Sequence, residues 1–356
     1  MILSEYSSKY PHRRYDPLRG EWVLVSPHRT ERPWLGNTEK KSDSKRLSYD
    51  PGCYLCPGNV RASGAVNPSY TTTFVFQNDF QALLSEIPDL DPSETVTQHS
   101  DIFQSTLVRG ECRVICFSPR HDLTLPKMEE TEIASVIDLW KAQAAELLQK
   151  YRWVQIFENK GDIMGCSNPH PHGQIWASSS LPNILSAEEK NLKVYYEKHA
   201  SPLLLDYLSV EEKEEERILV KNEDWAVVVP FWAVWPYETL LLPRVPIQRI
   251  TQITDRQRDS LAAILKQFLG LYDRLFDTSF PYSMGWHYAP GPVPENELTA
   301  SSPEIAHWTL HAHFYPPLLR SATVKKHMVG YEMLCEPQRD ITPEKAAKTL
   351  RELLPK

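Results

Sequence analysis

The chain has 356 residues, of which 41% are hydrophobic and 24% charged, so a folded globular protein of one large or two ordinary domains is expected and a disordered chain is excluded. Its 39 Lys and Arg against 46 Asp and Glu give a net charge of −7 without a dense basic run, so no nucleic-acid partner is expected. The longest uncharged run, residues 225–237, contains two prolines and falls short of the roughly 20 residues of a membrane span. We expect a core strand there and no association with a membrane.

The termini and the cysteines indicate the cellular environment. The first five residues hold no basic segment followed by an apolar stretch, so no secretory signal and a cytoplasmic location are expected. Six cysteines are too few for a disulfide scaffold in a chain of this length, and Cys53 and Cys56 stand in C-x-x-C spacing. Reduced thiols or metal ligands are therefore predicted.

Two segments of the chain follow the same order of predicted elements. The first runs from a strand over residues 113–117, through a loop with His121, to a strand over 123–126, a helix, a strand over 153–157 and a loop that reaches His170-Pro-His172. The second runs from a strand over 225–229, through a strand over 239–243, a helix and a strand over 280–284, to His311-Ala-His313. This repetition predicts an internally duplicated α+β protein with halves at residues 1–195 and 196–356.

Apolar residues in both predicted helices recur with the 3.6-residue period that buries one helix face. The first stripe is Ile133, Val136, Ile137, Trp140, Ala144, Leu147 and Leu148, and the second is Leu261, Ile264, Leu265, Phe268, Tyr272 and Leu275. Thr254 and Gln257 form a capping box for the second helix, worth ~1 kcal/mol. The acidic run over residues 211–216 is expected to be the solvated face of a helix.

The polar groups that carry chemistry gather at His170-Pro-His172-Gly-Gln174. In a strand, alternate side chains share a face, so His170, His172 and Gln174 are expected to point into one pocket. The preceding Gly165 and Ser167 suggest a nest of backbone N–H groups for an anion, and an imidazole beside such a nest is placed to attack phosphorus. A pair of structural histidines is the competing interpretation.

Metal ligation is the other use of these residue types. The C-x-x-C pair supplies two of the four ligands of tetrahedral zinc, and His121 with either His170 or His172 would complete the set. Cys112 and Cys116 lie in or beside a strand and are expected to be buried as small apolar residues.

A second metal site is predicted from His287, His311 and His313 with one carboxylate. The residue pattern alone leaves Glu188 and Glu189 as equal choices for that carboxylate. Zinc and ferrous iron both suit three histidines and one carboxylate, and a histidine cluster without metal is the alternative.

At these residues the chain resembles the galactose-1-phosphate uridylyltransferase family, the transferase branch of the histidine-triad superfamily. The resemblance covers nearly the whole chain, and its most specific blocks lie at residues 157–161, 167–172 and 280–287. It implies two tandem histidine-triad-like half-domains, each an antiparallel sheet with packed helices. The implied reaction passes UMP from UDP-glucose to galactose 1-phosphate, releasing glucose 1-phosphate and UDP-galactose, in a ping-pong route through a uridylyl-histidine at His172.

The resemblance also implies the roles of individual residues. Gln174 would hold phosphoryl oxygens where hydrolytic relatives carry a third histidine, and zinc would bind Cys53, Cys56, His121 and His170. A second ion, iron or zinc, would bind Glu188, His287, His311 and His313. Nucleotide contacts are implied for Arg29, Arg32, Asn78, Asp79, Asn159, Gly165, Cys166, Ser167, Gln174, Lys326, His327, Tyr331, Glu332 and Gln338, some of them reaching the site from the partner subunit of a homodimer.

The chain departs from the family pattern at His327, where Phe is common, at Tyr288, and in a longer segment over residues 290–305. Another nucleotidyl transferase or phosphorylase of the same superfamily is the alternative enzyme. A metal-stabilised nucleotide-binding protein without turnover is the alternative from a different class, and a purely structural zinc protein is a third interpretation.

Overall fold

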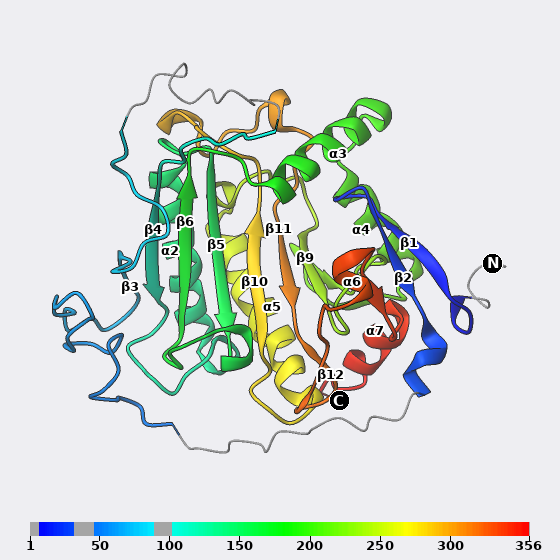
Figure 1. The fold of residues 1–356 in the computed structure, drawn as a ribbon, viewed down its shortest axis with the longest axis horizontal. Coiled ribbons are helices and arrows are strands. Elements are labelled where there is room, and N and C mark those ends of the chain that lie inside the picture. The colour runs from blue at the N-terminus through cyan, green and yellow to red at the C-terminus, as the bar shows by residue number, and fades with distance from the viewer. Residues whose placement is uncertain (1–6, 32–45, 89–101, 356) are drawn as a thin grey trace.

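The computed structural model describes residues 7–31, 46–88 and 102–355, and a nine-stranded antiparallel sheet forms its centre (Figure 1). The strands lie in the order β3-β4-β6-β5-β10-β11-β9-β8-β7. Their bounds are β3 Phe74–Gln77, β4 Gly110–Cys116, β5 Trp153–Lys160, β6 His172–Ser178, β7 Ile218–Lys221, β8 Trp225–Val228, β9 Thr239–Pro243, β10 Tyr282–His287 and β11 His311–Tyr315. The fold is thus the mixed, antiparallel one that was predicted.

The strand order reads the same outward from the central β5–β10 pair in both directions. The antiparallel pair β3–β4 lies where β8–β9 lies on the other side, and β6 lies where β11 does. The predicted repetition is therefore present, but its alignment was wrong. The strand predicted over residues 113–117 lies in β4, which ends at Cys116, and it matches β9 rather than β8, because β4 pairs with the histidine strand β6 as β9 pairs with β11.

The strand predicted over residues 123–126 is also absent. That segment instead makes a 3-10 turn at Leu125–Lys127, closed by hydrogen bonds from the Lys127 N–H to the Thr124 carbonyl and from the Met128 N–H to the Leu125 carbonyl. Pro126 fixes the turn conformation and has no N–H for a sheet ladder. The segment is a connection from β4 into the following helix.

Two long helices, α2 (Glu130–Leu147) and α5 (Asp255–Leu275), cover one face of the sheet and lie behind it in Figure 1. The predicted stripes are buried except for the half-buried Leu275, and Trp140 of α2 packs edge-on against Trp286 of β10 at 6.0 Å between centroids. Each fully buried large apolar side chain contributes roughly 1.5–3 kcal/mol. The capping box of Thr254 and Gln257 begins α5 as predicted.

A small sheet of β1 (His12–Asp16), β2 (Glu21–Val25) and β14 (Gln338–Arg339) joins the two ends of the chain. Around it lie α3 (Asn183–His199), α4 (Leu203–Glu214), α6 (Tyr331–Leu334), α7 (Pro343–Arg351) and the hairpin of β12 (Leu318–Ser321) and β13 (Val324–Lys325). Arg14 of β1 pairs with Glu344 of α7 at 2.7 Å. The N-terminal hairpin is thereby fastened to the C-terminal helix.

Two further expectations about single segments need correction. Glu211, in the acidic run that was expected to be solvated, is fully buried and bonds Arg217 at 2.7 Å. In the apolar run over residues 225–237 the strand ends at Val228, and the buried residues beyond it form a turn that begins at Pro230. Among the described residues, no helix is both long and apolar enough to cross a membrane.

Candidate active site and metal centres

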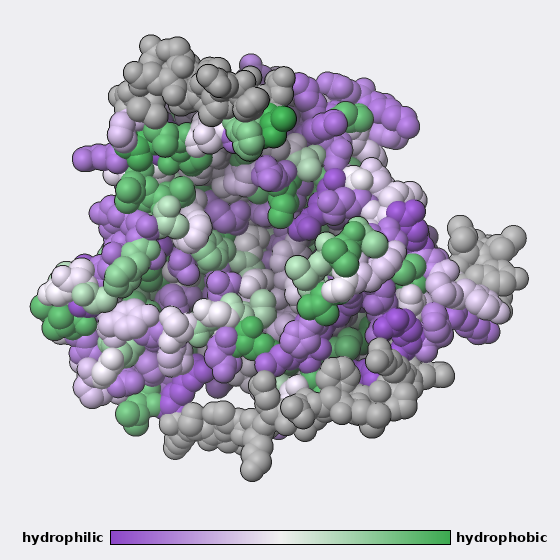
Figure 2. All heavy atoms as spheres, in the orientation of Figure 1, coloured by the Kyte–Doolittle hydropathy of each residue, from purple (hydrophilic) through white to green (hydrophobic). Residues whose placement is uncertain are grey.

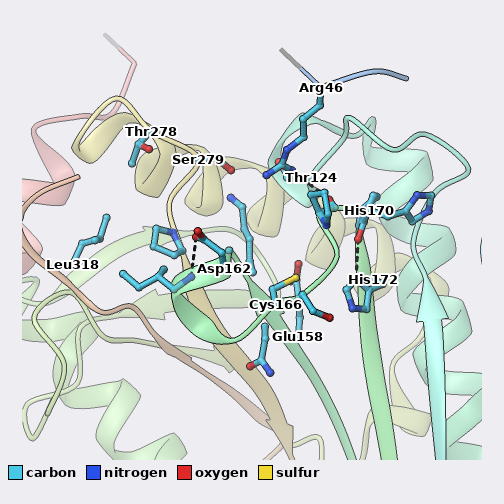
Figure 3. Close-up of a pocket in the computed structure, with 18 of the residues that line it drawn as sticks. Arg46, Thr124, Glu158, Asp162, Cys166, His170, His172, Thr278, Ser279 and Leu318 are labelled. Atoms are coloured by element: carbon cyan, nitrogen blue, oxygen red, sulfur yellow. Dashed lines mark hydrogen bonds between the residues drawn. The ribbon is translucent and has the colours of Figure 1, made fainter. Parts of the chain in front are cut away.

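A cleft of about 910 Å³ opens beyond the end of β5 and the start of β6 (Figure 3). Its wall includes His170, His172, Asn159, Cys166 and Ser167, all of which the sequence singled out. The sequence analysis missed two buried charged residues that also line it. These are Glu158, which accepts a hydrogen bond from the Tyr282 hydroxyl at 2.9 Å, and Lys160, which pairs with Asp273 at 3.0 Å.

The ring of His172 is oriented by the backbone of the same segment. Its Nδ1 lies 2.7 Å from the carbonyl oxygen of His170, as the dashed line in Figure 3 marks. A carbonyl oxygen only accepts, so Nδ1 carries the proton and the lone pair lies on Nε2. Burial lowers the pKa of His172, although the hydrogen bond to His170 acts in the opposite direction. A neutral imidazole with a free Nε2 thus borders the cleft.

Of the two residues from which an anion nest was predicted, Gly165 and Ser167, Gly165 has its N–H hydrogen-bonded within the loop before His170. The N–H of Gly165 donates to the Asp162 carbonyl at 2.9 Å, and the N–H of Cys166 donates to the Gly161 carbonyl at 3.2 Å. Both donors are spent inside the loop, which turns at Gly161 and Gly165 with φ of 92° and 79°, values that favour glycine. The donors that the loop can offer to an anion are therefore not those two N–H groups.

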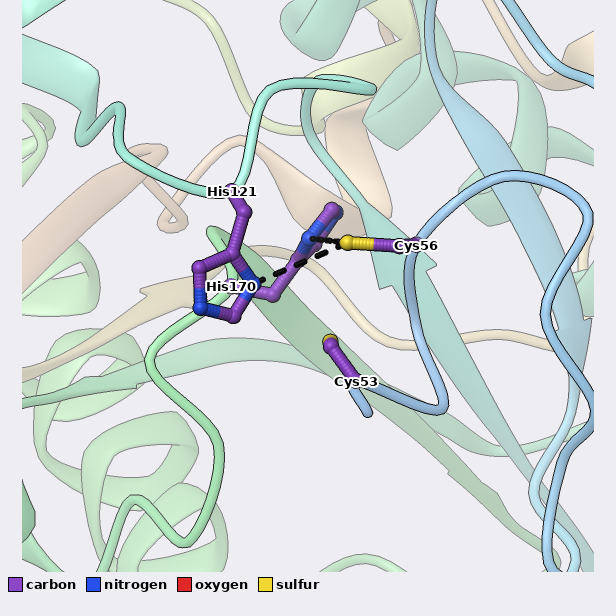
Figure 4. Close-up of side chains that lie close together, drawn as sticks. All are labelled: Cys53, Cys56, His121 and His170. Carbon is purple, nitrogen blue, oxygen red and sulfur yellow. Dashed lines mark hydrogen bonds between the residues drawn. The ribbon is translucent and has the colours of Figure 1, made fainter. Parts of the chain in front are cut away.

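Four buried side chains converge beside the cleft, Cys53, Cys56, His121 and His170 (Figure 4). Their ligand atoms lie within 4.8 Å of one another, and the Cys56 sulfur lies 3.7 Å from His121 Nδ1 and 3.5 Å from His170 Nδ1. Two thiols and two imidazoles are a common donor set for structural zinc. The structure assigns His170 to this cluster and leaves His172 outside it, which settles the choice that spacing left open.

Outer contacts fix the tautomer of His170 in this cluster. Its Nε2 lies 2.9 Å from the Ser118 carbonyl oxygen, so Nε2 carries the proton and Nδ1 turns its lone pair toward Cys56. Asn168, which the sequence analysis did not single out, donates to the Cys53 sulfur at 3.3 Å and accepts the His170 N–H at 2.9 Å. Asn168 therefore connects the thiol loop to the histidine loop.

The ionisation of the first cluster follows from its burial. Burial lowers the pKa of His170 to about 4, and the neighbouring His121 adds to that shift. Burial raises the pKa of the Cys56 thiol to about 11. All six cysteines are free, and Cys112 and Cys116 are buried in the core as predicted.

A second buried cluster joins Glu188 of α3 to His287 of β10 and to His311 and His313 of β11. Both carboxylate oxygens of Glu188 lie near His287 Nδ1, at 3.1 and 3.0 Å, while His311 Nε2 and His313 Nε2 lie 3.7 and 3.8 Å away. These last two nitrogens have no hydrogen-bond partner among the described residues. A fully buried carboxylate facing imidazole lone pairs fits a divalent cation.

The geometry also separates Glu188 from Glu189. Neighbouring residues of a helix point about 100° apart, so only one of them can face the histidines. Glu188 is fully buried among them, whereas Glu189 turns away to pair with Arg152 at 3.5 Å.

Gln174 does not line the cleft with His172, contrary to the single pocket that was expected. His170 precedes the first residue of β6, so the strand's alternation does not apply to it. The Gln174 Oε1 accepts a hydrogen bond from the Trp176 indole at 3.2 Å, and this contact leaves the amide NH₂ of Gln174 as the free donor.

Most of the other residues expected near a nucleotide form two further groups, none of whose members lines the cleft. One is tied to the C-terminal segment: Lys326 bonds Glu332 and the Gln338 carbonyl at 2.5 Å each, and Gln338 and Arg29 both contact Asp340. Beside this group, Tyr331 bonds Glu336 and His327 is exposed.

The other group follows β3, where the Asn78 side chain caps its own loop and Asp79 faces Arg61 at 3.6 Å. Arg32 lies outside the described residues. Within the described residues of a single chain, the expected nucleotide contacts therefore do not all come together.

Two of the three departures from the family pattern, Tyr288 and the segment over residues 290–305, make contacts with the rest of the fold. Tyr288 is buried, donates to the Val154 carbonyl at 2.5 Å and packs on Trp153. The segment over residues 290–305 is held by the Gly291 N–H, which donates to the Arg152 carbonyl at 3.0 Å, and by Thr251, whose hydroxyl donates to the Leu298 carbonyl. These contacts pack the longer segment against the residue before β5 and against the turn at Ile250–Gln252.

Comparison with known proteins gives a consistent result over the whole chain. Residues 3–182 match the model of the galactose-1-phosphate uridyl transferase N-terminal domain, and residues 188–356 match that of the C-terminal domain. Galactose-1-phosphate uridylyltransferase of Haemophilus influenzae is 55% identical over 97% of this chain and 95% of its own, and that of Rattus norvegicus is 52% identical over 99% and 90%. A solved uridylyltransferase structure, 26% identical, superposes with a TM-score of 0.73 over 96% of this chain and 97% of that one.

Proposed function

The chain belongs to the galactose-1-phosphate uridyl transferase family, and we propose that it passes UMP from UDP-glucose to galactose 1-phosphate, giving glucose 1-phosphate and UDP-galactose. Relatives that are about half identical over nearly the whole chain and carry the uridylyltransferase name support this activity. The single observation that carries the mechanism is the orientation of His172 at the cleft.

His172 is the nucleophile in this proposal. Its Nε2 lone pair attacks the α-phosphorus of UDP-glucose, the N–P bond forms, and the P–O bond to glucose 1-phosphate breaks. A phosphate oxygen of galactose 1-phosphate then attacks the same phosphorus, breaks the N–P bond and frees the histidine. The His170 carbonyl holds the Nδ1 proton throughout and stabilises the positive charge that the ring gains in each displacement.

In the same proposal Gln174, which does not line the cleft but follows His172 by two residues on the same face of β6, holds the phosphoryl oxygens. Its Oε1 accepts the Trp176 indole N–H, so the neutral NH₂ is the group that would donate to them. A neutral amide stabilises phosphoryl charge without supplying an acidic proton, and this favours transfer over hydrolysis.

We assign zinc to Cys53, Cys56, His121 and His170, because paired thiols and imidazoles select it. Zinc bound there would fix the loop that carries the His170 carbonyl and so keep His172 aligned. Iron or zinc is assigned to Glu188, His287, His311 and His313, whose nitrogen and oxygen donors suit both ions.

A homodimer would complete the nucleotide site. Arg29, Lys326 and Gln338 do not line the cleft of their own chain, although the neighbouring Lys325 does, and in this proposal they serve a partner's site. Beside them, Val329, Tyr331, Met333 and Leu334 are exposed on and before α6, where Figure 2 shows hydrophobic side chains on the surface. Such a patch is typical of a contact between subunits.

We also infer that residues 1–195 and 196–356 are fused halves of common origin, which the mirrored strand order supports. The first ion would lie wholly within the first half, whereas the second would bridge Glu188 to the histidines of the second half. The six free thiols suit the cytoplasmic location that we propose.

Exchange of labelled glucose 1-phosphate into UDP-glucose, with galactose 1-phosphate left out, tests the proposed function. A ping-pong enzyme catalyses this half-reaction alone, and we expect exchange with UDP-glucose but not with ADP-glucose. Exchange only with ADP-glucose would mean a related nucleotidyl transferase with another nucleotide. Tight UDP binding without any exchange would mean a nucleotide-binding protein and would overturn the proposal.

A further inference from the structure

We propose that Arg19 and Tyr315 form a brace that orients His313 toward the second metal ion. The same brace connects His313 to α3, the helix that carries Glu188. The inference deepens the proposed second metal site and rests on it. It concerns how firmly that ion is held, rather than which residues bind it.

The need for a brace follows from a difference between two neighbouring ligands. His311 Nδ1 donates to the Thr309 carbonyl at 2.8 Å, which fixes its tautomer and aims Nε2 at Glu188. His313 Nε2 also faces Glu188, but neither of its ring nitrogens has a hydrogen-bond partner among the described residues. Ligating histidines are normally oriented by a hydrogen bond from the second nitrogen, so another interaction must hold this ring.

Tyr315 supplies that interaction by stacking. It lies two residues beyond His313 on β11, so both side chains leave the same face of the strand. The two rings are 5.3 Å apart at an interplanar angle of 18°, while the rings of His287 and His311 meet His313 edge-on. A parallel neighbour on one side limits rotation of the imidazole about its long axis.

Arg19 holds the far end of Tyr315. Its Nη2 donates to the tyrosine hydroxyl at 3.3 Å, and both residues line a chamber of about 80 Å³ that His313 also borders. Two carboxylic acids complete the polar lining, Asp16 and Glu238. The guanidinium therefore borders the same chamber as these two carboxyl groups.

The turn that carries Arg19 is docked onto the helix of the fourth ligand. Asp16 Oδ1 accepts the backbone N–H groups of Leu18 and Arg19 at 2.9 and 3.3 Å, which sets the shape of the turn between β1 and β2. Asn191 of α3 donates to the Leu18 carbonyl at 2.8 Å. Asn191 lies one helical turn after Glu188 and thus on the same side of α3.

This geometry makes the β1–β2 turn a bridge between two ligands that come from distant parts of the sequence. On one side it contacts α3, which positions Glu188, and on the other it reaches Tyr315, which positions His313. Loosening the bridge leaves all four ligands in the chain but lets two of them drift apart. The expected result is weaker retention of the second ion with the first ion unaffected.

The test uses full-length protein loaded with cobalt and measures both sites under competition from a chelator. Cobalt bound by thiolates gives a sulfur-to-metal charge-transfer band that reports on the first site, and total metal analysis then gives the occupancy of the second. The variants are Arg19→Met, which keeps an unbranched stem, Tyr315→Leu, which removes the stack, and Tyr315→Phe, which keeps it. Arg13→Met is the matched control, because Arg13 is an exposed arginine of β1 that pairs with Glu336.

We expect Arg19→Met and Tyr315→Leu to bind the second ion about 10- to 100-fold more weakly, the range found when outer contacts of metal ligands are removed. Tyr315→Phe should lose less, and Arg13→Met should match the wild type. If Arg19→Met and Tyr315→Leu both bound the second ion as tightly as the wild type, the proposed brace would be wrong. It would also be wrong if both variants unfolded and lost both ions together. A wild-type protein that binds one equivalent and still exchanges UDP-glucose would refute the second metal site while leaving the proposed transfer intact.

Discussion

The two histidine strands occupy equivalent places in the sheet but use their histidines differently. In β11 both His311 and His313 belong to the strand and face the same metal cluster. In β6 the strand begins only at His172, so His170 falls in the preceding loop and turns to the thiols. A shift of the strand start by two residues thus separates a member of the thiol cluster from the imidazole that borders the cleft. In the proposed function, this difference leaves one ring of the His-x-His motif in β6 available for reaction, whereas both rings of the motif in β11 face the second cluster.

The largest effect is expected when the imidazole of His172 is removed. We expect His172→Ala to reduce exchange between UDP-glucose and glucose 1-phosphate by at least about 1,000-fold, since a covalent nucleophile has no substitute. Both metal equivalents should remain, because His172 is outside both clusters. Exchange within tenfold of the wild type would show that another group attacks phosphorus.

A smaller effect is expected from the amide that follows on the same strand. Gln174→Glu keeps the shape of the side chain but replaces its donor NH₂ with a carboxylate, so transfer should fall by about 100- to 1,000-fold. Gln174→His instead tests the choice between transfer and hydrolysis, and we expect it to raise release of free UMP. Unchanged transfer with no gain in hydrolysis would count against the proposed role of the amide.

One variant in each ligand cluster distinguishes the contributions of the two clusters to transfer. Cys56→Ser should lose one metal equivalent and slow transfer by about 100-fold, because the loop that aligns His172 is tied to that cluster. His311→Ala should lose the other metal equivalent but change the rate of transfer by less than tenfold, because none of the residues of the second cluster borders the cleft. Metal analysis and exchange rates measured on the same samples decide the point. Equal losses of activity would contradict the separation of the two sites.

A further difference is expected in the pH dependence of metal binding. Burial raises the pKa of Cys56 to about 11, so at neutral pH the incoming ion must displace its proton. Burial lowers the pKa of His311 to about 4, so that ligand is already unprotonated. From pH 6 to 8 we expect affinity at the thiol site to rise by up to about tenfold per pH unit for each proton released, and affinity at the second site to stay nearly constant. Equal slopes in competition titrations would refute this difference.

The sequence predicted the features that depend on local periodicity. The stripes of α2 and α5 and the capping box at Thr254 rest on short spacings that helices enforce. The two complete ligand sets were implied by the family resemblance, because spacing left His170 or His172, and Glu188 or Glu189, as open choices. The segment at residues 123–126 was mistaken for a strand because a short apolar run that ends in proline also suits a turn.

Contacts between distant segments were beyond the reach of such spacing. Glu188 and His287 are 99 residues apart in sequence, and the turn that carries Arg19 lies 173 residues from Asn191. Asn168 lay inside a block that the sequence analysis had already quoted, but only the approach of the thiol loop reveals its contacts with Cys53 and His170. Glu158 and Lys160 escaped notice because nothing in a strand sequence indicates which of its charged residues border a cleft.

An intact-mass measurement tests directly whether His172 is the nucleophile. The protein is mixed briefly with UDP-glucose, with and without galactose 1-phosphate, and His172→Ala is measured in parallel. If His172 is the nucleophile, the mass of the protein increases by one uridylyl group as glucose 1-phosphate is released. This gain in mass disappears when galactose 1-phosphate is added and is absent from the variant. An unmodified mass in metal-loaded protein that turns over UDP-glucose, or an adduct that persists in His172→Ala, would contradict the role of His172.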